Sequence, residues 1–215
     1  MMFHVKLHRE LMPEPLELEA LKRYENFLRD RAIPLGLIDE ADRDRLWERH
    51  IQDSLRARAC LIASDRLIAD IGSGAGLPGI PLAIMEPARS FVLIERRQRR
   101  AAILEIAVEL LGLSNVAVAA KSSVEVVLRA DLAITRAVGD LASSWAVADP
   151  LLKPGGRLLY FAGRTWSPPP AWGTAGGLDA LCRVCSAPEF PWQGPLVIMS
   201  REGGSTDAGE ESSNG

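Results

Sequence analysis

The chain has 215 residues, a formal net charge of −3 at pH 7, 47% hydrophobic residues and 25% charged residues. This composition is typical of one globular domain, excludes a disordered or fibrous chain, and gives no overall positive charge that would attract nucleic acid, so any such contact needs a local patch. No apolar run approaches the roughly 18 residues that a membrane helix needs, and the amino terminus lacks the apolar core of a signal peptide, so we expect a cytoplasmic protein that does not bind membranes.

Residues 1–62 are predicted to form a helical segment that packs on the main domain. Apolar side chains between Leu21 and Leu28 recur at helical spacing, so the helix over 16–31 has one buried stripe. A second helix is expected to begin near Asp42, a suitable N-cap, and to run toward residue 61.

Polar residues of this second helix allow local contacts. Arg49 lies four residues before Asp53, a spacing that permits an ion pair. His50 lies beside the apolar face, and we interpret it as a packing or hydrogen-bonding residue rather than a catalyst.

The next stretch, residues 67–82, is the most informative one in the chain. An apolar run ends in Asp70 and Ile71, and glycine then occupies every second position, at 72, 74 and 76, before an apolar segment that begins at Pro78. This pattern predicts a buried strand, a tight turn and a helix with Pro78 in its first turn. Because glycine has no Cβ and allows positive φ, we expect a small molecule to lie on the peptide N–H groups of this turn.

Spacing restricts the ligand that the turn can bind. The turn lacks the Gly-Lys-Ser/Thr ending of a phosphate loop, and Leu77 stands where a dinucleotide site needs glycine or alanine. Asp70 precedes the turn, and Glu95 ends the next apolar run, about where an acid would meet a ribose. Two carboxylates around a glycine turn favour a ligand with a ribose and a positive centre, and S-adenosylmethionine has both.

The rest of the chain alternates between strand and helix patterns. We expect strands at 67–71, 91–94, 115–119, 132–135 and 157–161, the last introduced by a turn at 153–156, with helices running through residue 85, over 98–111 and between 139 and 152, and two shorter strands near 181 and over 196–199. This alternation predicts an α/β fold with a mostly parallel, doubly covered sheet. The domain is expected to span 63–200, followed by a disordered tail at 201–215.

Ligands of such sheets bind beyond the carboxyl ends of the strands. The residues expected there are Asp70, Glu95, the loop after Ala119, and the pair Thr135 and Arg136.

The predicted helix at 98–111 carries both apolar and basic residues. Ile103, Ile106, Ala107 and Leu110 are predicted to form its buried face, and Gly112 follows as the C′ residue. The densest positive run of the chain overlaps its start, with arginines at 96, 97, 99 and 100. These arginines are either a solvated helix face, paired with glutamates 105 and 109, or contacts to phosphates.

Cys182 and Cys185 form a C-x-x-C pair in a predicted strand. Residues three apart in a strand point to opposite faces, and the chain offers no second pair of ligands. Three cysteines cannot build a disulfide framework. We therefore expect a structural role for this pair and no metal site.

The run from Asp70 to Pro81, with its Gly-Leu-Pro-Gly-Ile-Pro extension, resembles the RsmG (GidB) family of bacterial methyltransferases of a guanine N7 in small-subunit (16S) ribosomal RNA. Other landmarks of the family follow in order: Arg49-His50 with Asp53-Ser54, Arg99-Arg100, Leu111-Gly112-Leu113 with Asn115-Val116, Arg136-Ala137-Val138, and Leu152 to Gly156. The resemblance covers roughly residues 46–161 and implies a class I methyltransferase (Rossmann-like) fold.

The resemblance also implies a set of site residues. For S-adenosylmethionine they are Gly72, Leu77, the backbone of Val124 and Glu125, and Arg136, in addition to Asp70, Gly74 and Glu95 from the turn and its flanks. Arg99 and Arg100 are implied as RNA-binding residues. No catalytic residue is named, because guanine N7 carries a free lone pair and the reaction needs alignment rather than a general base.

The implied partner is 16S ribosomal RNA or the small ribosomal subunit, and we expect a monomer. The chain departs from the family pattern at three places: 34–37, where an Asn-Leu-Thr segment is usual, Ser123, where an arginine is expected, and Ala162, where a lysine is expected. Two alternatives stay open: a non-catalytic module that binds the donor or RNA, which Ser123 and Ala162 suggest, and an NAD(P)-dependent oxidoreductase of the same fold.

Overall fold

The computed structural model describes residues 13–136, 139–167, 180–186 and 188–201. Its centre is a seven-stranded sheet in the order β3-β2-β1-β4-β5-β7-β6. The strands are β1 (Leu67–Ile71), β2 (Ser90–Ile94), β3 (Val116–Ala119), β4 (Ala130–Arg136), β5 (Leu152–Phe161), β6 (Ala180–Ser186) and β7 (Leu196–Arg201). The expected strands are all present, which confirms the α/β prediction.

Strands β1 to β5 are mutually parallel, and β7 is antiparallel to both β5 and β6. Ile71 at the end of β1 pairs with Ile94 of β2 and with Thr135 of β4. The carboxyl ends of these strands therefore meet at one edge of the sheet, the edge at which parallel sheets bind ligands.

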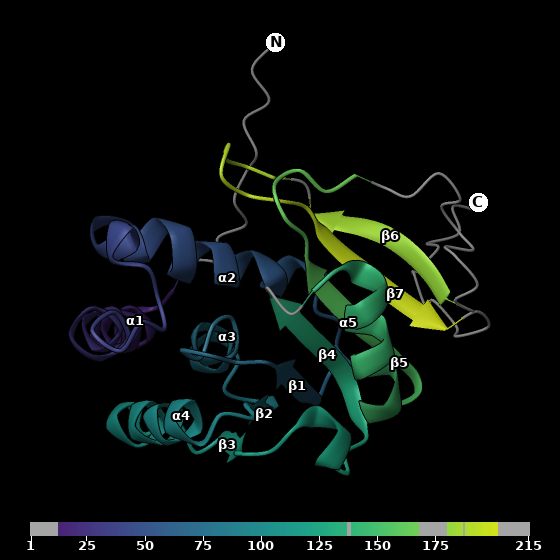
Figure 1. Cartoon of the computed structure of the whole chain (residues 1–215), viewed down its shortest axis with the longest axis horizontal. Coiled ribbons are helices and arrows are strands. Elements are labelled where there is room, and N and C mark those ends of the chain that lie inside the picture. Colours follow the sequence, from purple (N-terminus) through teal and green to yellow (C-terminus); the bar gives the residue numbers. More distant parts are fainter. Residues whose placement is uncertain (1–12, 137–138, 168–179, 187, 202–215) are drawn as a thin grey trace, which may run out of the picture.

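Helices cover both faces of the sheet (Figure 1). The α-helices are α1 (Pro15–Phe27), α2 (Asp53–Leu55), α3 (Gly79–Met85), α4 (Gln98–Leu111) and α5 (Leu141–Ala148). Helix α5 packs through Trp145 on the face that carries Ala133 and Leu158, and α3 packs on the opposite face. The sheet is therefore doubly covered, as the alternating pattern predicted.

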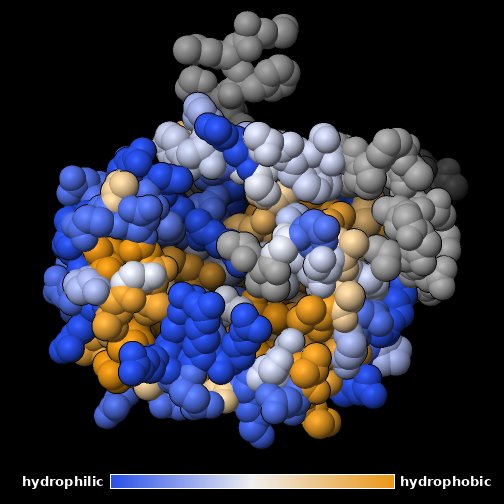
Figure 2. Space-filling view, viewed as in Figure 1, coloured by the Kyte–Doolittle hydropathy of each residue, from blue (hydrophilic) through white to orange (hydrophobic). Residues whose placement is uncertain are grey.

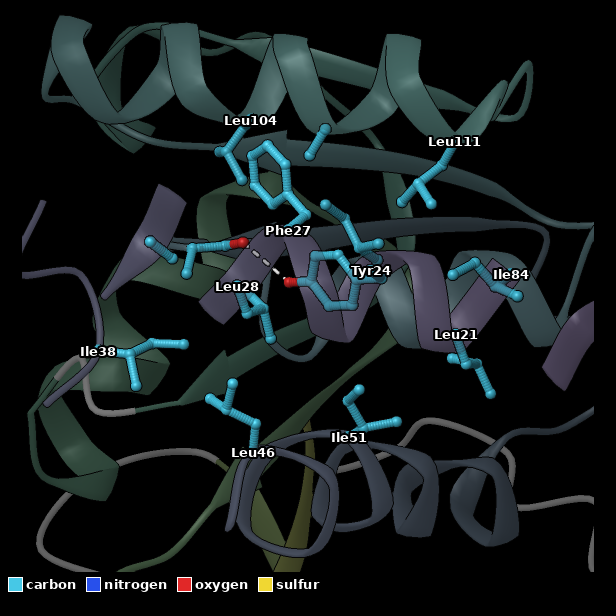
Figure 3. Packing of buried hydrophobic residues seen from close by; sticks show 14 of the residues in the cluster. Leu21, Tyr24, Phe27, Leu28, Ile38, Leu46, Ile51, Ile84, Leu104 and Leu111 are labelled. Atoms are coloured by element: carbon cyan, nitrogen blue, oxygen red, sulfur yellow. Dashed lines mark hydrogen bonds between the residues drawn. The ribbon is translucent and has the colours of Figure 1, made fainter. Parts of the chain in front are cut away.

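The N-terminal helices share a hydrophobic core with α3 and α4. Leu21, Tyr24 and Leu28 are fully buried, as their spacing predicted, and they pack with Ile84 of α3 and Leu104 of α4 (Figure 3). This segment is therefore part of one continuous core.

The predicted second helix is present, but its pitch varies and its start differs. Residues 40–60 form a 3-10 turn, a π-helical stretch, α2 and a second 3-10 turn in succession. The N-cap is Asp39, whose side chain accepts the N–H of Ala41. Asp42 lies inside the helix, where its carboxylate pairs with Arg49 at 2.7 Å and His50 at 2.9 Å. The predicted Arg49–Asp53 pair is therefore wrong, and the hydrogen-bonding role of His50 is confirmed.

Helix α4 has the predicted bounds, and its buried face differs in part from the predicted one. Its buried residues are Ala101, Leu104, Ala107 and Leu111. Of the predicted face, Ala107 is buried and Ile103 packs against the core, whereas the side chains of Ile106 and Leu110 are 49% and 47% exposed. Gly112 ends the helix with φ +67°, as predicted for a C′ glycine.

Strand β5 is longer than predicted. Residues 153–156 interrupt its pairing with β4 rather than precede the strand, since Leu152 pairs with Ala130 and Arg157 pairs with Leu132. The predicted tail overlaps the last residue of β7, and its remainder lies outside the described residues.

The predicted opposite orientation of Cys182 and Cys185 is confirmed. Cys182 is a buried thiol in the core beneath α5, and Cys185 lies on the opposite face of the sheet. Cys185 forms a disulfide with Cys60, whose Cα is 5.9 Å away. Sequence reasoning did not foresee this bond.

The surface is mostly hydrophilic with smaller hydrophobic patches on the face drawn in Figure 2. Across the described residues, no helix has the length and apolar character that crossing a membrane requires.

Candidate functional site

The glycine turn connects β1 to α3 and adopts the conformation that its sequence predicts. Gly72, Gly74 and Gly76 have φ of +74°, +58° and +99°, values that other residues rarely adopt. A Cβ at Gly74 would meet only the Gly72 carbonyl oxygen, at 3.8 Å, so one side of the turn is open. A Cβ at Gly76 would overlap the Ile80 side chain, so this glycine serves close packing.

Most N–H groups of the turn are used within the chain. Those of Gly72 and Ser73 donate to the carbonyl oxygen of Ile94, and those of Gly76 and Leu77 donate to that of Ser73. The expectation that a ligand lies on these N–H groups is therefore wrong for these four residues. The open side of the turn is glycine backbone, with no side chains that would keep a ligand away.

Tyr24 of α1 holds the turn from the side of the core. Its hydroxyl donates to the Ala75 carbonyl oxygen at 2.8 Å (Figure 3), and its ring is fully buried. Burial raises the pKa of this hydroxyl well above its usual value, so it remains a donor. The N-terminal helices thereby fix the position of the turn.

Asp70 is buried at the end of β1. Its Oδ2 accepts the N–H of Gly79 at the start of α3, at 3.0 Å, and its Oδ1 is buried with no partner among the described residues. Burial raises the pKa of Asp70 to about 7, although the Gly79 hydrogen bond opposes this shift. Pro78 precedes α3 as its N-cap residue, so its predicted place within the first turn is wrong.

Glu95 follows β2 and closes over the glycine turn. Its Oε2 accepts the N–H of Gly74 at 3.2 Å, and its Oε1 accepts that of Arg97 at 2.9 Å. The carboxylate is only 5% exposed. Glu95 and Gly74, both predicted from the sequence, are thus in direct contact.

Arg136 is the last residue of β4. Because Thr135 pairs with Ile71, the next residue, Arg136, lies beside Gly72. Its Nη2 lies 3.2 Å from Asp53 Oδ2 and donates to the Arg49 carbonyl oxygen at 3.0 Å. Its Nη1 is buried and has no partner within the described part of the chain.

Of the remaining predicted residues, Leu77 belongs to the turn through the bond of its N–H to the Ser73 carbonyl oxygen, and the others lie in the turn after β3 and at the start of α4. Val124 and Glu125 are exposed in a short 3-10 turn after β3, where Glu125 accepts the N–H of Ser122. Leu77 is partly buried against the core of the N-terminal helices. Arg99 and Arg100 lie in the first turn of α4, and the ion pairs found among the described residues include neither of them.

A cavity of about 310 Å³ lies beside Arg136. Asp53, Phe161 and Arg164 line it, together with Trp192 from the loop before β7. Sequence reasoning did not select Trp192. The only local signal is the pair of aromatic residues at 190 and 192 between two strands, which is too common to predict a site.

Comparisons with known proteins agree with this architecture. The model of the family rRNA small subunit methyltransferase G (GidB) matches residues 17–167. The chain is 40% identical over 152 residues to ribosomal RNA small subunit methyltransferase G of Mycobacterium sp. (strain KMS), which covers 68% of this chain and 66% of that protein. It is 42% identical over 157 residues to the protein of that name from Thermobifida fusca (strain YX), covering 72% and 65%. The match thus spans just under two thirds of the length of these relatives.

Solved structures show the same fold. The O-methyltransferase TomG from Streptomyces achromogenes, solved with SAM, has a TM-score of 0.56 at 18% identity, covering 86% of this chain and 90% of that one. P. horikoshii TYW2, solved with MeSAdo, has a TM-score of 0.55 at 14% identity, covering 71% and 63%. The likeness establishes a class I methyltransferase fold. The family match shows that the chain belongs to the rRNA small subunit methyltransferase G (GidB) family.

Proposed function

We propose that the protein is an S-adenosylmethionine-dependent methyltransferase that acts on N7 of a guanine in 16S ribosomal RNA. The observation that carries this proposal is the glycine turn between Asp70 and Glu95 in a chain that matches the GidB family over residues 17–167. An NAD(P)-dependent oxidoreductase is not favoured, because the family match points to methyl transfer and Leu77 stands where a dinucleotide site needs a small residue.

The residues around the turn suit S-adenosylmethionine. Gly72 and Gly74 leave a surface without side chains, and Glu95 holds a carboxylate beside it for ribose hydroxyls. The buried Oδ1 of Asp70 and Oγ1 of Thr135 have no hydrogen-bond partner among the described residues, so polar atoms at this edge remain to be satisfied. We assign Leu77, Val124, Glu125 and Arg136 to the same donor site.

The chemistry requires little from side chains. S-adenosylmethionine supplies a methyl group on a positively charged sulfur, and guanine N7 has a lone pair that accepts it without a general base. The task of the protein is then to hold the two reactants aligned and close. The paired strand ends and the Tyr24 hydrogen bond provide a fixed turn for this purpose.

We further propose that the RNA is bound through Arg99 and Arg100 at the start of α4. A net charge of −3 leaves such contacts to local patches. Ribosomal RNA as substrate would place the protein in the cytoplasm.

Calorimetry and mass spectrometry test the proposal separately. We expect S-adenosylmethionine and its demethylated product to bind the purified protein, and NADH not to bind. We expect ribosomal RNA from a deletion strain to lack one N7-methylguanine that reappears when the gene is restored. Absence of donor binding would refute the cofactor assignment, and an unchanged methylation profile would refute the substrate assignment.

A further inference from the structure

The cavity beside Arg136 has a positive lining, although the whole chain carries a formal net charge of −3. The charged residues that line it are Arg56, Arg136, Arg164 and Asp53. Three arginines against one aspartate leave an excess of two positive charges around a space of about 310 Å³. This volume is at the lower end of small-ligand sites, and a hollow with such a charge excess concentrates anions. The lining therefore favours a small anionic group.

Asp53 holds two of these arginines in fixed positions. Its Oδ1 lies 2.9 Å from Arg56 Nη1, and its Oδ2 lies 3.2 Å from Arg136 Nη2. Arg56 Nη2 also donates to the Gly194 carbonyl oxygen at 3.2 Å, and Arg136 Nη2 donates to that of Arg49 at 3.0 Å. One carboxylate is thus shared by two guanidinium groups and neutralises only one of their charges. Because both side chains are already ordered, an anion would meet their charge without the entropic cost of ordering them.

Arg164 is the accessible positive group of this cavity. It is exposed in the turn that follows β5, and it has neither an ion pair nor a hydrogen bond to any described residue. A Cβ on the neighbouring Gly163 would meet no atom within 4 Å, so the backbone beside Arg164 is open as well. A guanidinium group matches the oxygens of a phosphate or a carboxylate with two parallel hydrogen bonds. Arg164 can therefore contact an anion directly, whereas Arg56 and Arg136 contribute their charge.

The cavity lies next to the place where the methyl group would be transferred. Arg136 at the end of β4 pairs with Phe161 at the end of β5, and Thr135 pairs with Ile71 of β1. The end of β4 therefore separates the cavity, on the β5 side, from the glycine turn, on the β1 side. An acceptor base that leaves its stack to reach a donor on the turn stays joined to its own backbone. The phosphates beside that base must then pass along this edge of the sheet.

We propose that this cavity binds a backbone phosphate of the RNA beside the acceptor guanine, with Arg164 donating to the phosphate oxygens. Arg56 and Arg136 stabilise the bound charge from the wall of the cavity. The inference rests on the proposed function and adds a second RNA contact, because α4 follows β2 on the other side of the glycine turn. The carboxylate of the donor has the same chemistry, but Arg164 follows β5, beyond β4 from the turn, and we therefore assign the anion to the RNA.

The first test measures the salt dependence of RNA binding by the whole protein. The probe is small-subunit ribosomal RNA from the deletion strain, and the variants are Arg164→Gln and Arg164→Lys. Loss of one phosphate contact in Arg164→Gln should reduce the slope of log affinity against log salt by about 0.7 to 0.9, which is a loss of affinity of about five- to eightfold at 0.1 M salt. Arg164→Lys keeps the charge and should keep the slope of the wild type.

Arg183→Gln is the matched control. Arg183 is also exposed and has no ion pair among the described residues, but it lies on β6 and does not line the cavity. Its removal should change the slope clearly less. An equal effect of Arg164→Gln and Arg183→Gln, or an unchanged slope in Arg164→Gln, would overturn the proposal. Weaker donor binding in Arg164→Gln with an unchanged slope would assign the cavity to the donor carboxylate and would overturn it as well.

A second measurement needs no RNA. In a titration of the wild type with inorganic phosphate, the Nε–H resonance of Arg164, identified by its loss in Arg164→Gln, should shift and reach saturation. The Nε–H resonance of Arg183 should move little, and equal shifts of both resonances would contradict a built anion site. Donor calorimetry and mass spectrometry of the RNA report on the proposed function separately. A protein that methylates its RNA and is indifferent to Arg164→Gln would therefore refute this inference alone.

Discussion

Asp70 shows how one buried carboxylate at the glycine turn affects the whole fold. It is 1% exposed, and one of its oxygens has no partner among the described residues. Because burial raises its pKa from 3.8 to about 7, the folded state binds a proton that the unfolded state releases between these two pH values. Its contribution to stability is therefore largest below about pH 4 and is lost as the pH rises through 7.

Asp70→Asn should remove this pH dependence. The amide keeps an oxygen that can accept the Gly79 N–H and carries no charge to bury. We expect the advantage of the variant over the wild type in free energy of unfolding to grow by about 3 kcal/mol between pH 5 and pH 8.5. Urea unfolding between pH 5 and 8.5, without ligand, measures the difference.

Asp131 provides a control of opposite sign. Burial acts to raise its pKa, but hydrogen bonds from Lys153 and from the Leu67 and Arg66 N–H groups outweigh burial and leave the pKa below its usual value. Asp131→Asn should therefore lower the free energy of unfolding across the same pH range. If Asp70→Asn were equally destabilising at pH 8.5, the carboxylate would be needed in its charged form.

At the scale of single elements, the sequence predicted the bounds of α4 but not its orientation. Ile106 and Leu110 are more hydrophobic than Ala101, so a pattern based on hydrophobicity selects two exposed residues and misses a buried one. Which face is buried depends on how closely α4 approaches β2 and α1. The side chains of those two elements set this distance. Local periodicity contains no information about it.

The glycine turn, too, was only partly predictable from the sequence. Positive φ at Gly72, Gly74 and Gly76 was predictable, because glycine in a tight turn readily adopts it. The use of the Gly72 and Gly74 N–H groups was not, because their acceptors, the Ile94 carbonyl oxygen and the Glu95 carboxylate, come from the end of a different strand. The cavity was equally hidden, because Arg136 and Trp192 are brought together only by the antiparallel return of β7 to β5.

The start of α4 is an unfavourable place for positive charge. Arg99 and Arg100 lie in its first turn, which contains no acidic residue, and cations near a helix N-terminus are destabilising. We expect Arg99→Ala with Arg100→Ala to weaken binding of ribosomal RNA and to reduce the slope of log affinity against log salt by about 1.5. Donor affinity should be unchanged, and the melting temperature unchanged or slightly raised. Filter binding at several salt concentrations, calorimetry and thermal melting measure these quantities.

Arg29→Ala with Arg31→Ala is the matched control, because it removes the same charge from the π-helical stretch Leu28–Ala32 that follows α1. Its effect on the salt slope should be clearly smaller. An equal effect of both pairs would show that RNA binding follows total charge rather than a contact at α4. Equal loss of RNA and donor affinity in the Arg99 and Arg100 variant would show that the helix itself had been damaged.

At the scale of the whole molecule, the disulfide joins the end of the N-terminal helices to the edge of the sheet. Cys60 lies in the last turn before β1, and Cys185 lies on β6, which among the described strands pairs only with β7. The sequence separation of 125 residues makes this a large closed loop. A chain-entropy argument gives about 5 kcal/mol as the upper value of its stabilisation.

Cys60→Ser should therefore lower the free energy of unfolding of the oxidised protein by about 2–5 kcal/mol, because the unfolded chain regains the freedom that the closed loop removes. Reductant should have the same effect on the wild type and none on the variant. Urea unfolding with and without reductant measures both, and peptide mapping should recover the Cys60 and Cys185 peptides linked. Cys182→Ala is the control, since this buried thiol makes no bond, and that variant should keep the full response to reductant. A wild type that is indifferent to reductant would mean that the edge strand is held by its pairing with β7 and by apolar packing, with no covalent contribution.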